Sequence, residues 1–402
     1  MGLAALLRRS GAQGSNTGDR RSRLPLGLYR KRALRHDVRH GYVAAPGRRR
    51  ARRRTDRDPG HPGALCGGHP PYTYFETLES SRRLLEAHRT AAEGRVRSWV
   101  GLEHWVYCSP QCFHDAADLA AEFDTGIHTH SSETTWEVEE CLKRYGLRPI
   151  EQFYNWGILS ARTVIAHCVW LDDREIEILA RTGTAVAHCP CSNMKLSSGA
   201  ARVLDMRRAG VTVGLGSDGE KENNNLDLIE EMKFAALLQK ITTLDPATGD
   251  PWAVLDMATL GGARALGLDS ITGSLEPGKR ADVITVDLRG LHTTPLLHGP
   301  EFNAAAHLVF SASGHDVADV WVDGHRLVES GEVKSVDVGR VRATAQAAAE
   351  ELFDRVRRLR ERGEVPTPPS PAPHQFLSDP TKHADSGEPV QSGQSPAALG
   401  GS

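Results

Sequence analysis

Residues 164–199 read VIAHCVWLDDREIEILARTGTAVAHCPCSNMKLSSG, and this stretch decides the fold of the chain. It contains two short apolar segments, 164–167 and 185–188, and each of them ends in histidine. Between them lies a segment, 172–181, whose apolar residues recur at helical spacing. A strand, a helix and a second strand in this order predict two parallel neighbours in one sheet.

The same alternation continues on both sides of this stretch. Strands are predicted at about 97–107, 125–130, 163–167, 184–188 and 211–216, and helices at about 76–89, 111–123, 135–145, 172–181, 200–209 and 226–240. Five such units indicate a (β/α)8 TIM barrel, an α/β fold that typically takes about 250 residues. We therefore predict a barrel over 71–265 in which strands 4–8 are recognisable. Because three further units would have to lie within residues 1–99, the barrel is expected to be incomplete at the N-terminus.

The pattern changes after the barrel. A helix is predicted at 252–266, followed by short strands within 273–287 and 317–331. The pair Asp323-Gly324 is typical of a hairpin turn between such strands. These features predict a small partial β-sandwich domain over 266–335 and a C-terminal helix over 336–364. Residues 365–402 are rich in Pro, Ser and Gly, which predicts a disordered tail.

The first 70 residues differ in composition from the rest of the chain. They hold 16 Arg and one Lys against four Asp, and they lack Ile, Phe and Trp, whereas the whole chain has a net charge of -2. Three interpretations are open: a nucleic-acid-binding arm, a disordered basic leader, or a GC-rich gene read in the wrong frame. The Arg runs have no interleaved aromatic residues and the segment has few lysines, which disfavours nucleic acid as a partner, and we favour the third interpretation.

The composition also bears on the cellular compartment. No apolar run approaches the ~20 residues of a membrane span, so no membrane partner is expected. The start, MGLAALLRRSG, lacks the length and cleavage site of a signal peptide. Seven scattered cysteines argue against a disulfide scaffold and favour a reducing compartment. The chain is therefore predicted to be cytoplasmic.

Histidines and a carboxylate follow the ends of successive predicted strands. His130, His167 and His188 close three strands, and Asp218 follows the fourth. Catalytic groups of a barrel lie at the C-terminal ends of its strands, so these side chains are expected at one rim. A lone histidine at such a place is more often a buried structural residue. Three histidines and an aspartate in register favour a metal site with an open position.

These segments resemble the amidohydrolase superfamily, in the aminohydrolase branch that includes 5-methylthioadenosine/S-adenosylhomocysteine deaminases and triazine hydrolases. The segments that carry the resemblance are IHTHSSETTWEVEE (127–140), the opening stretch (164–199), AGVTVGLGSDGEKENNNLDLIEEMKFAALLQ (209–239) and GSLEPGKRADVITVDL (273–288). The resemblance covers roughly residues 72–360. It implies a metal-dependent hydrolase of non-peptide C–N bonds that deaminates an amino-substituted purine or related heterocycle. The alternatives are a triazine-type chlorohydrolase or aminohydrolase, and an inactive fragment.

The resemblance also implies roles for four residues. His130 would ligate one divalent metal ion, zinc or iron, and Asp218 would ligate the same ion and accept a proton from water. Glu133 would be the proton shuttle, and His167 would hydrogen-bond the substrate or the attacking water. The chemistry needs two carboxylates with different tasks, one that takes a proton from water and one that protonates the ring.

Three other histidines have less certain roles. His104 falls where relatives place a substrate-contacting histidine, although the local spacing departs from the family pattern. His188 lies in the family's strand-7 motif, and a substrate-binding role and a structural role are both open. His128 is expected on the opposite face of its strand from His130, with a structural role.

The family pattern breaks at the front of the chain. Relatives supply two further metal ligands from a His-x-His pair on strand 1, and the only such pair here is His128 with His130. The histidines of the first 70 residues, His36, His40, His61 and His69, do not have this spacing. Catalytic zinc sites normally have three protein ligands. Three hypotheses are open: a wrong reading frame at the start, an inactive remnant, or ligands from elsewhere, such as His36 or His40.

Weaker motifs leave further alternatives. Cys108 with Cys112 and Cys189 with Cys191 lack partner pairs at metal-finger spacing, so buried thiols are favoured over a soft-metal site. Four tryptophans near strand ends could stack on a heteroaromatic ring or pack in the core: Trp105, Trp136, Trp156 and Trp170. The expected partners are a small heterocyclic substrate and water, and a homo-oligomer is possible.

Overall fold

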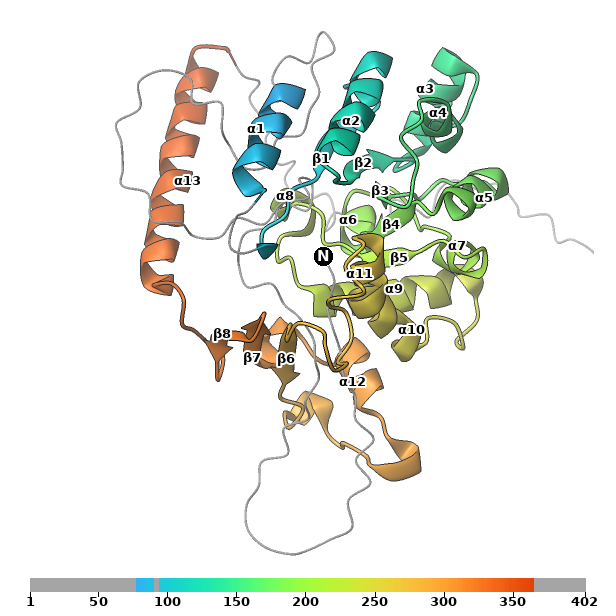
Figure 1. Ribbon diagram of the computed structural model, residues 1–402. Coiled ribbons are helices and arrows are strands. Elements are labelled where there is room, and N and C mark those ends of the chain that lie inside the picture. The colour runs from blue at the N-terminus through green and yellow to red at the C-terminus, as the bar shows by residue number, and fades with distance from the viewer. Residues whose placement is uncertain (1–76, 90–93, 365–402) are drawn as a thin grey trace, which may run out of the picture. The chain divides into compact units, whose positions relative to one another are not determined.

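The structure is a computed structural model that describes residues 77–89 and 94–364 (Figure 1). The predicted leader, 1–70, and the predicted disordered tail, 365–402, lie outside these ranges and stay predictions. The chain divides into two compact units, residues 1–336 and 337–402, and each is described by itself. Among the described residues, no helix is long and apolar enough to cross a bilayer.

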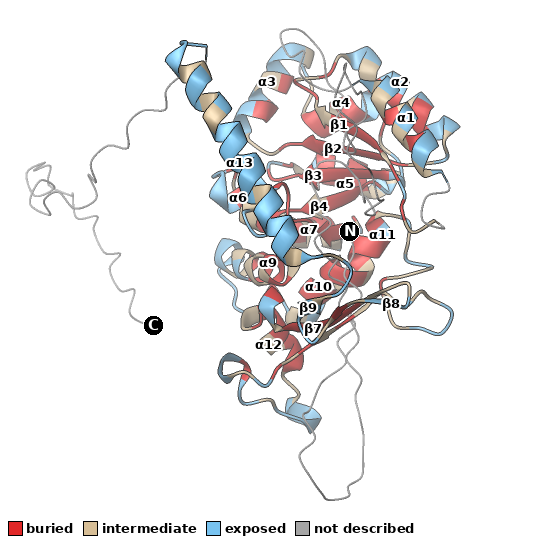
Figure 2. Ribbon diagram, turned by 90° about the vertical axis from the view of Figure 1, so that its left-hand side faces the viewer, coloured by how far each residue is buried: buried red, intermediate tan, exposed pale blue. Residues whose placement is uncertain are grey.

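The larger unit contains a sheet of five parallel strands in chain order. The strands are β1 (Val100–His104), β2 (Ile127–Ser131), β3 (Thr163–His167), β4 (Ala185–His188) and β5 (Val213–Leu215). Every residue of β2 and β3 is buried, and Figure 2 shows the sheet as a buried layer. The predicted parallel order is confirmed, and the strand ends meet at one edge because Ser131 pairs with His167 and His104 with His130.

Helices connect and cover these strands (Figure 1). They are α1 (Leu78–His88), α2 (Pro110–Glu122), α3 (Thr135–Tyr145), α4 (Pro149–Asn155), α5 (Asp173–Thr182), α6 (Pro190–Lys195), α7 (Val203–Arg208), α8 (Glu220–Asn223) and α9 (Leu228–Thr243). Helix α5 shows how the sequence sets their ends. Asp172 and Glu175 form a capping box at its start, and Gly183 takes a left-handed conformation at its end.

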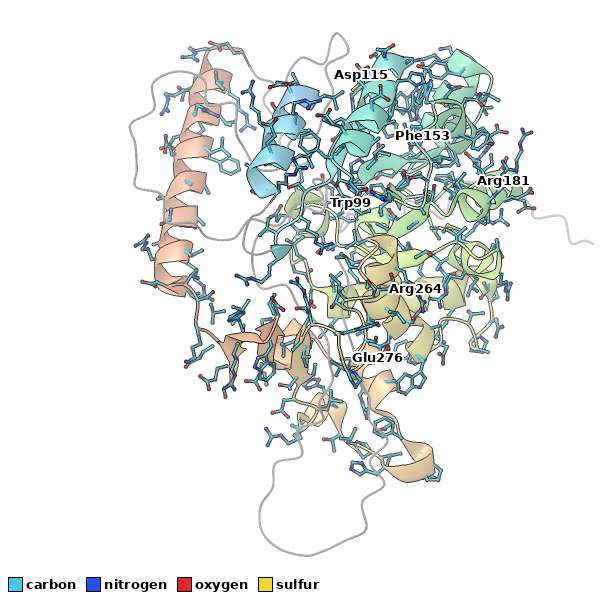
Figure 3. All side chains as sticks on the ribbon, viewed as in Figure 1. Trp99, Asp115, Phe153, Arg181, Arg264 and Glu276 are labelled. Carbon is cyan, nitrogen blue, oxygen red and sulfur yellow. The ribbon has the colours of Figure 1, made fainter. Side chains whose placement is uncertain are left out.

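Aromatic rings fill the space between α2 and α4. Phe113 of α2 stacks on Trp156, which ends α4, with ring centroids 4.6 Å apart. Phe153 of α4, labelled in Figure 3, lies 5.3 Å from the Phe113 ring. Such offset ring pairs add to the free energy gained from burial alone, so they fix the two helices beside each other.

The predicted helix 252–266 is interrupted in the structure. It consists of α10 (Pro251–Asp256), a π-helical turn (Met257–Gly261) and α11 (Gly262–Ala265). This region packs tightly on β5, because a Cβ atom added at Gly214 would lie 2.9 Å from the Cα atom of Gly262. The glycines therefore allow two backbones to touch, a contact that helical periodicity alone cannot reveal.

A second sheet follows, with four antiparallel strands. They are β6 (Val283–Val286), β7 (Val317–Val322), β8 (His325–Glu329) and β9 (Glu332–Val333), with α12 (Ala304–Phe310) between β6 and β7. Single 3-10 turns occupy Leu291–Thr293, Gly299–Glu301 and Gly314–Asp316. Asp323 and Gly324 both have positive φ, 50° and 77°, as the tight turn between β7 and β8 requires.

The smaller unit contains one long helix, α13 (Val338–Glu361). The side chain of Asp337 caps its first turn by accepting a hydrogen bond from the backbone N–H of Arg340. None of its residues is buried, which agrees with its charged sequence.

Candidate active site

A pocket of about 250 Å³ lies at the carboxyl ends of the parallel strands. Five of the six predicted site residues line it, namely His104, His130, Glu133, His167 and Asp218. Its other lining residues are Glu103, Val106, Tyr107, Thr134, Trp136, Glu137 and Leu196. The fold thus brings together side chains from β1, β2, β3 and the loop after β5, as expected for the rim of a barrel.

The backbone is strained at the carboxyl ends of the strands that carry these side chains. Ser132, His167 and Asp218 adopt positive φ angles of 54°, 72° and 59°. Such angles are uncommon for residues with a Cβ atom, and they persist only where the surrounding structure enforces them. At each of these positions the backbone turns sharply as it leaves the strand. Backbone strain of this kind is typical of functional sites.

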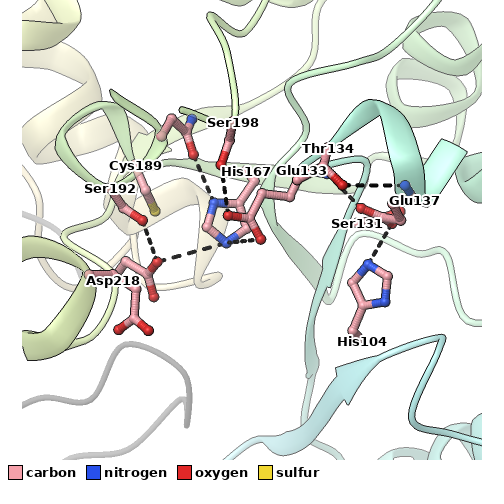
Figure 4. A network of polar contacts seen from close by, with 12 residues as sticks. His104, Ser131, Glu133, Thr134, Glu137, His167, Cys189, Ser192, Ser198 and Asp218 are labelled. Atoms are coloured by element: carbon pink, nitrogen blue, oxygen red, sulfur yellow. Dashed lines mark hydrogen bonds and ion pairs between the residues drawn. The ribbon is translucent and has the colours of Figure 1, made fainter. Parts of the chain in front are cut away.

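His167 lies between the two candidate catalytic carboxylates (Figure 4). Its Nε2 atom is 3.7 Å from Oε2 of Glu133 and 4.0 Å from Oδ2 of Asp218. The ring of His130 lies alongside, with its centroid 5.7 Å from that of His167. His130, His167 and Asp218 are all buried, and Glu133 is partly open to the pocket.

One short segment after β4 supports all three of these groups. Ser192 donates a hydrogen bond of 2.6 Å to Oδ2 of Asp218, and Ser198 donates one of 3.0 Å to Oε1 of Glu133. Between them, Oδ1 of Asn193 lies 2.9 Å from Nδ1 of His167. The sequence reasoning missed these three residues. The polar run SNMKLSSG directly after a strand-end histidine was the signal that could have found them.

His104 lines the pocket with both ring nitrogens already in contact with protein groups. Its Nε2 atom lies 2.8 Å from Oε1 of Glu137, and its Nδ1 atom accepts a hydrogen bond of 3.2 Å from the backbone N–H of Val106. Burial lowers the pKa of His104, but the carboxylate of Glu137 raises it by more, and the net pKa is above its ordinary value. His104 therefore faces the pocket mainly with its ring surface.

His188 is not brought to the pocket. It is fully buried, and neither of its ring nitrogens has a hydrogen-bond partner among the described residues. Burial, and secondly the nearby ring of His167, lower the pKa of His188 to about 4. A substrate-binding role for His188 stays a prediction without geometric support, and the structural alternative fits its surroundings better.

The expected face of His128 was wrong, whereas its expected structural role stays a prediction. Its ring lies beside that of His130, with centroids 5.4 Å apart, so the two side chains share one face of β2. The physical reason is the period of a strand, because residues two positions apart point to the same side.

The tryptophans separate into two groups. Trp105 and Trp156 are buried in the core, whereas Trp136 is 57% exposed and lines the pocket. Trp170 donates a hydrogen bond of 2.7 Å from its indole nitrogen to the carbonyl oxygen of Ser198. Trp105 and Trp156 therefore pack in the core, one of the two predicted alternatives. Trp136 lies where it can contact a bound ring.

The four cysteines of the two predicted pairs are free thiols, and two of them are buried. Cys108 and Cys189 are buried, and Cys112 and Cys191 are half-buried. Burial raises the pKa of the Cys189 thiol well above its ordinary range, which keeps it protonated and unreactive.

The pocket offers the donor types of a zinc site but not the full number. Imidazole and carboxylate groups of His130, His167, Glu133 and Asp218 suit zinc or iron. Within residues 77–89 and 94–364, however, no group of three or more His, Cys, Asp or Glu side chains is arranged to hold a metal ion. The predicted ligands His130 and Asp218 therefore stay predictions, and the described residues do not complete the site.

The comparisons with known proteins agree with this geometry. The profile of the amidohydrolase family matches residues 39–327, which is more than half of the chain. The chain belongs to the amidohydrolase family. The match begins within the segment predicted as a leader. The predicted amidohydrolase-type barrel is thereby confirmed as the fold class, and the described residues contain five of its parallel strands.

Curated relatives of this amidohydrolase include 5'-deoxyadenosine deaminases and 5-methylthioadenosine/S-adenosylhomocysteine deaminases. The 5'-deoxyadenosine deaminase of Methanothermobacter thermautotrophicus is 43% identical over 275 residues, which are 68% of this chain and 63% of that relative. The chain thus spans 63% of the length of the relative it matches. The predicted resemblance to this deaminase branch is confirmed.

Two solved structures show the same fold. A zinc-bound adenosine deaminase from Xanthomonas campestris superposes with a TM-score of 0.66 at 31% identity, covering 73% of this chain and 65% of its own. A zinc complex of atrazine chlorohydrolase from Arthrobacter aurescens has a TM-score of 0.62 at 26% identity, covering 70% and 62%. Both branches named by the resemblance, purine deaminases and triazine hydrolases, are therefore structural neighbours.

Proposed function

We propose that this chain is part of an enzyme that hydrolytically deaminates an amino-substituted purine or related heterocycle. The observation that carries the proposal is the position of His167 between Glu133 and Asp218, with Nε2 3.7 Å and 4.0 Å from their carboxylate oxygens. The names of the curated relatives, which are deaminases of adenine nucleosides, support the purine as the substrate class.

The proposed chemistry divides the proton transfers between two carboxylates. Asp218 accepts a proton from the attacking water, and His167 holds that water or the substrate by a hydrogen bond from its ring. Glu133, partly open to the pocket, protonates the ring nitrogen beside the amino-bearing carbon. That carbon becomes tetrahedral, and the proton held by Asp218 passes to the amino group, which leaves as ammonia. Glu133 recovers its proton from the added hydroxyl, so the heterocycle keeps a carbonyl oxygen. Glu133 and Asp218 thus take the two different tasks that the chemistry requires.

A divalent metal ion, zinc with iron as the alternative, is the proposed cofactor. The zinc-bound structural neighbours support zinc. Such an ion makes hydroxide available from water at neutral pH. His130 and Asp218 are the proposed ligands on this chain, but two ligands fall short of the three that a catalytic zinc site normally has. The steps above are therefore assigned only to the side chains.

The test is an ammonia-release assay of the full chain with and without added zinc. The substrates are 5'-deoxyadenosine, 5'-methylthioadenosine and adenosine, with a chlorinated and an aminated triazine beside them. Release from a purine that disappears in Glu133→Gln supports the proposal. The matched control is Glu139→Gln, since Glu139 is an exposed carboxylate on α3, the helix that follows Glu133, and should keep activity.

Two other outcomes would replace the proposal. Turnover of the triazines alone would assign the alternative function, which the atrazine chlorohydrolase neighbour favours. No turnover of any substrate by a folded, zinc-supplemented chain would leave an inactive fragment. A cytoplasmic location and a homo-oligomeric state stay predictions alongside the proposed small heterocyclic substrate.

A further inference from the structure

Glu137 is a buried carboxylate that none of the proposed chemical steps uses. It lies in the first turn of α3 and is 1% exposed, yet both of its oxygens accept hydrogen bonds (Figure 4). Oε1 accepts from the Trp105 indole nitrogen at 3.0 Å and from the backbone N–H of Ser132 at 2.7 Å. A carboxylate so well supplied with donors is stabilised in its charged form despite burial.

The same carboxylate also contacts two residues of the pocket wall. Oε2 accepts a hydrogen bond of 2.7 Å from the backbone N–H of Glu133, and Oε1 lies 2.8 Å from Nε2 of His104. Glu137 thus joins the end of β1, which carries His104, to the strained turn after β2, which carries Glu133. These segments lie about 30 residues apart in sequence, so no local interaction could hold them together.

The contacts of His104 fix its protonation pattern. The backbone N–H of Val106 points at Nδ1, so that nitrogen must offer a lone pair, and the proton must lie on Nε2 toward Glu137. Burial raises the pKa of Glu137, but the contact with His104 and the hydrogen bonds from the backbone N–H groups of Ser132 and Glu133 lower it by more. Glu137 therefore acts as a charged acceptor for a ring held in one tautomer.

We propose that Glu137 is a positioning residue that sets the place of the proton donor Glu133 and of the pocket-wall residue His104. The inference rests on the proposed function for its catalytic consequence, but the hydrogen-bond network can be tested without turnover. An amide cannot replace this carboxylate, because every contacting group is a donor and the amide N–H would oppose one of them.

The first test is the NMR spectrum of the full chain labelled with nitrogen-15. In the wild type, the Trp105 indole N–H should be displaced from the other indole signals, and His104 should carry its proton on Nε2. In Glu137→Gln both signatures should change, whereas Glu139→Gln, a matched loss of one charge on the exposed side of the same helix, should leave them unchanged. A wild-type His104 protonated on Nδ1 would overturn the inference even if Glu137→Gln fails to fold.

The second test applies if the wild type turns over a purine. We expect Glu137→Gln to lower kcat by about 10²-fold, the loss that a misplacement near 1 Å can cause. Glu137→Asp should recover part of kcat because it keeps the charge, and Glu139→Gln should stay near the wild-type rate. An unchanged kcat in folded Glu137→Gln would overturn the positioning role. Absence of turnover in the wild type would instead count against the proposed function, and the NMR test would still decide the network.

Discussion

Oδ1 of Asn193 lies 2.9 Å from Nδ1 of His167, and this contact determines which ring nitrogen faces the pocket. An amide oxygen only accepts, so Nδ1 of His167 carries the proton and Nε2 is directed toward Glu133 and Asp218. Asn193, a residue outside the predicted site, thus sets which ring nitrogen of His167 meets the two carboxylates.

Replacing Asn193 with alanine should free the His167 ring. We expect Asn193→Ala to lower kcat/KM by roughly 10- to 100-fold, because the ring loses the partner that sets its tautomer and orientation. The measurement is steady-state deamination of the purine that the wild type accepts. Asn155→Ala, at an exposed position at the end of α4, is the control and should match the wild type. Equal loss in both variants would contradict the assigned role.

Removing the Ser198 hydroxyl should affect Glu133, the proposed proton donor, alone. Ser198→Ala takes away the 3.0 Å hydrogen bond to Oε1 of Glu133, and a single hydrogen bond contributes about 0.5–1.5 kcal/mol. We expect kcat to fall about tenfold with little change in KM, since the role proposed for Glu133 is in the proton transfer. Its neighbour Ser197 is exposed, and Ser197→Ala serves as the matched control. A rise in KM at constant kcat would assign Ser198 to substrate binding instead.

Zinc affinity tests the two predicted ligands. We expect the chain to bind zinc weakly, because the described residues hold no group of three metal-binding side chains. His130→Ala and Asp218→Ala should each abolish this binding in a competition titration with a coloured chelator. His114 is exposed on α2, so His114→Ala controls for loss of a surface imidazole. Undiminished zinc binding by both site variants would show that the metal is held elsewhere.

Glu231 should make stability depend on pH. Burial raises the pKa of this carboxyl in α9 to about 8, although contacts from the Cys191 backbone N–H and the Asn223 amide lower it. The folded chain thus keeps this proton up to about pH 8, whereas the unfolded chain loses it near the ordinary value of 4.5. Because the folded state binds more protons between these values, the free energy of unfolding should fall as pH rises through this window.

The neutral variant Glu231→Gln isolates this effect. We expect the decline in unfolding free energy between pH 5 and pH 8.5, measured with urea, to be smaller in Glu231→Gln by on the order of 3 kcal/mol. Glu220→Gln, an exposed carboxylate on α8, should keep the wild-type slope. A decline equally steep in Glu231→Gln would mean that other groups cause the pH dependence.

Local pattern was sufficient for much of the fold. The apolar runs before His130, His167 and His188 predicted three parallel strands, because the spacing of buried residues reports directly on strand and helix periods. The pattern also placed His130, His167 and Asp218 at one edge, since parallel strands end on the same side. It misplaced the face of His128, through an error in applying the two-residue period of a strand, and it grouped His188 with the rim although that side chain does not line the pocket.

The sequence by itself therefore determined the parallel sheet, the family and the candidate catalytic residues at the strand ends. Only the tertiary structure decided what holds them: Ser192 against Asp218, Asn193 against His167, Ser198 against Glu133, and Glu137 against His104. The physical reason is one of distance along the chain. Period and composition describe neighbours in sequence, whereas each of these hydrogen bonds joins residues about 26 to 65 positions apart, which meet only after the sheet has formed.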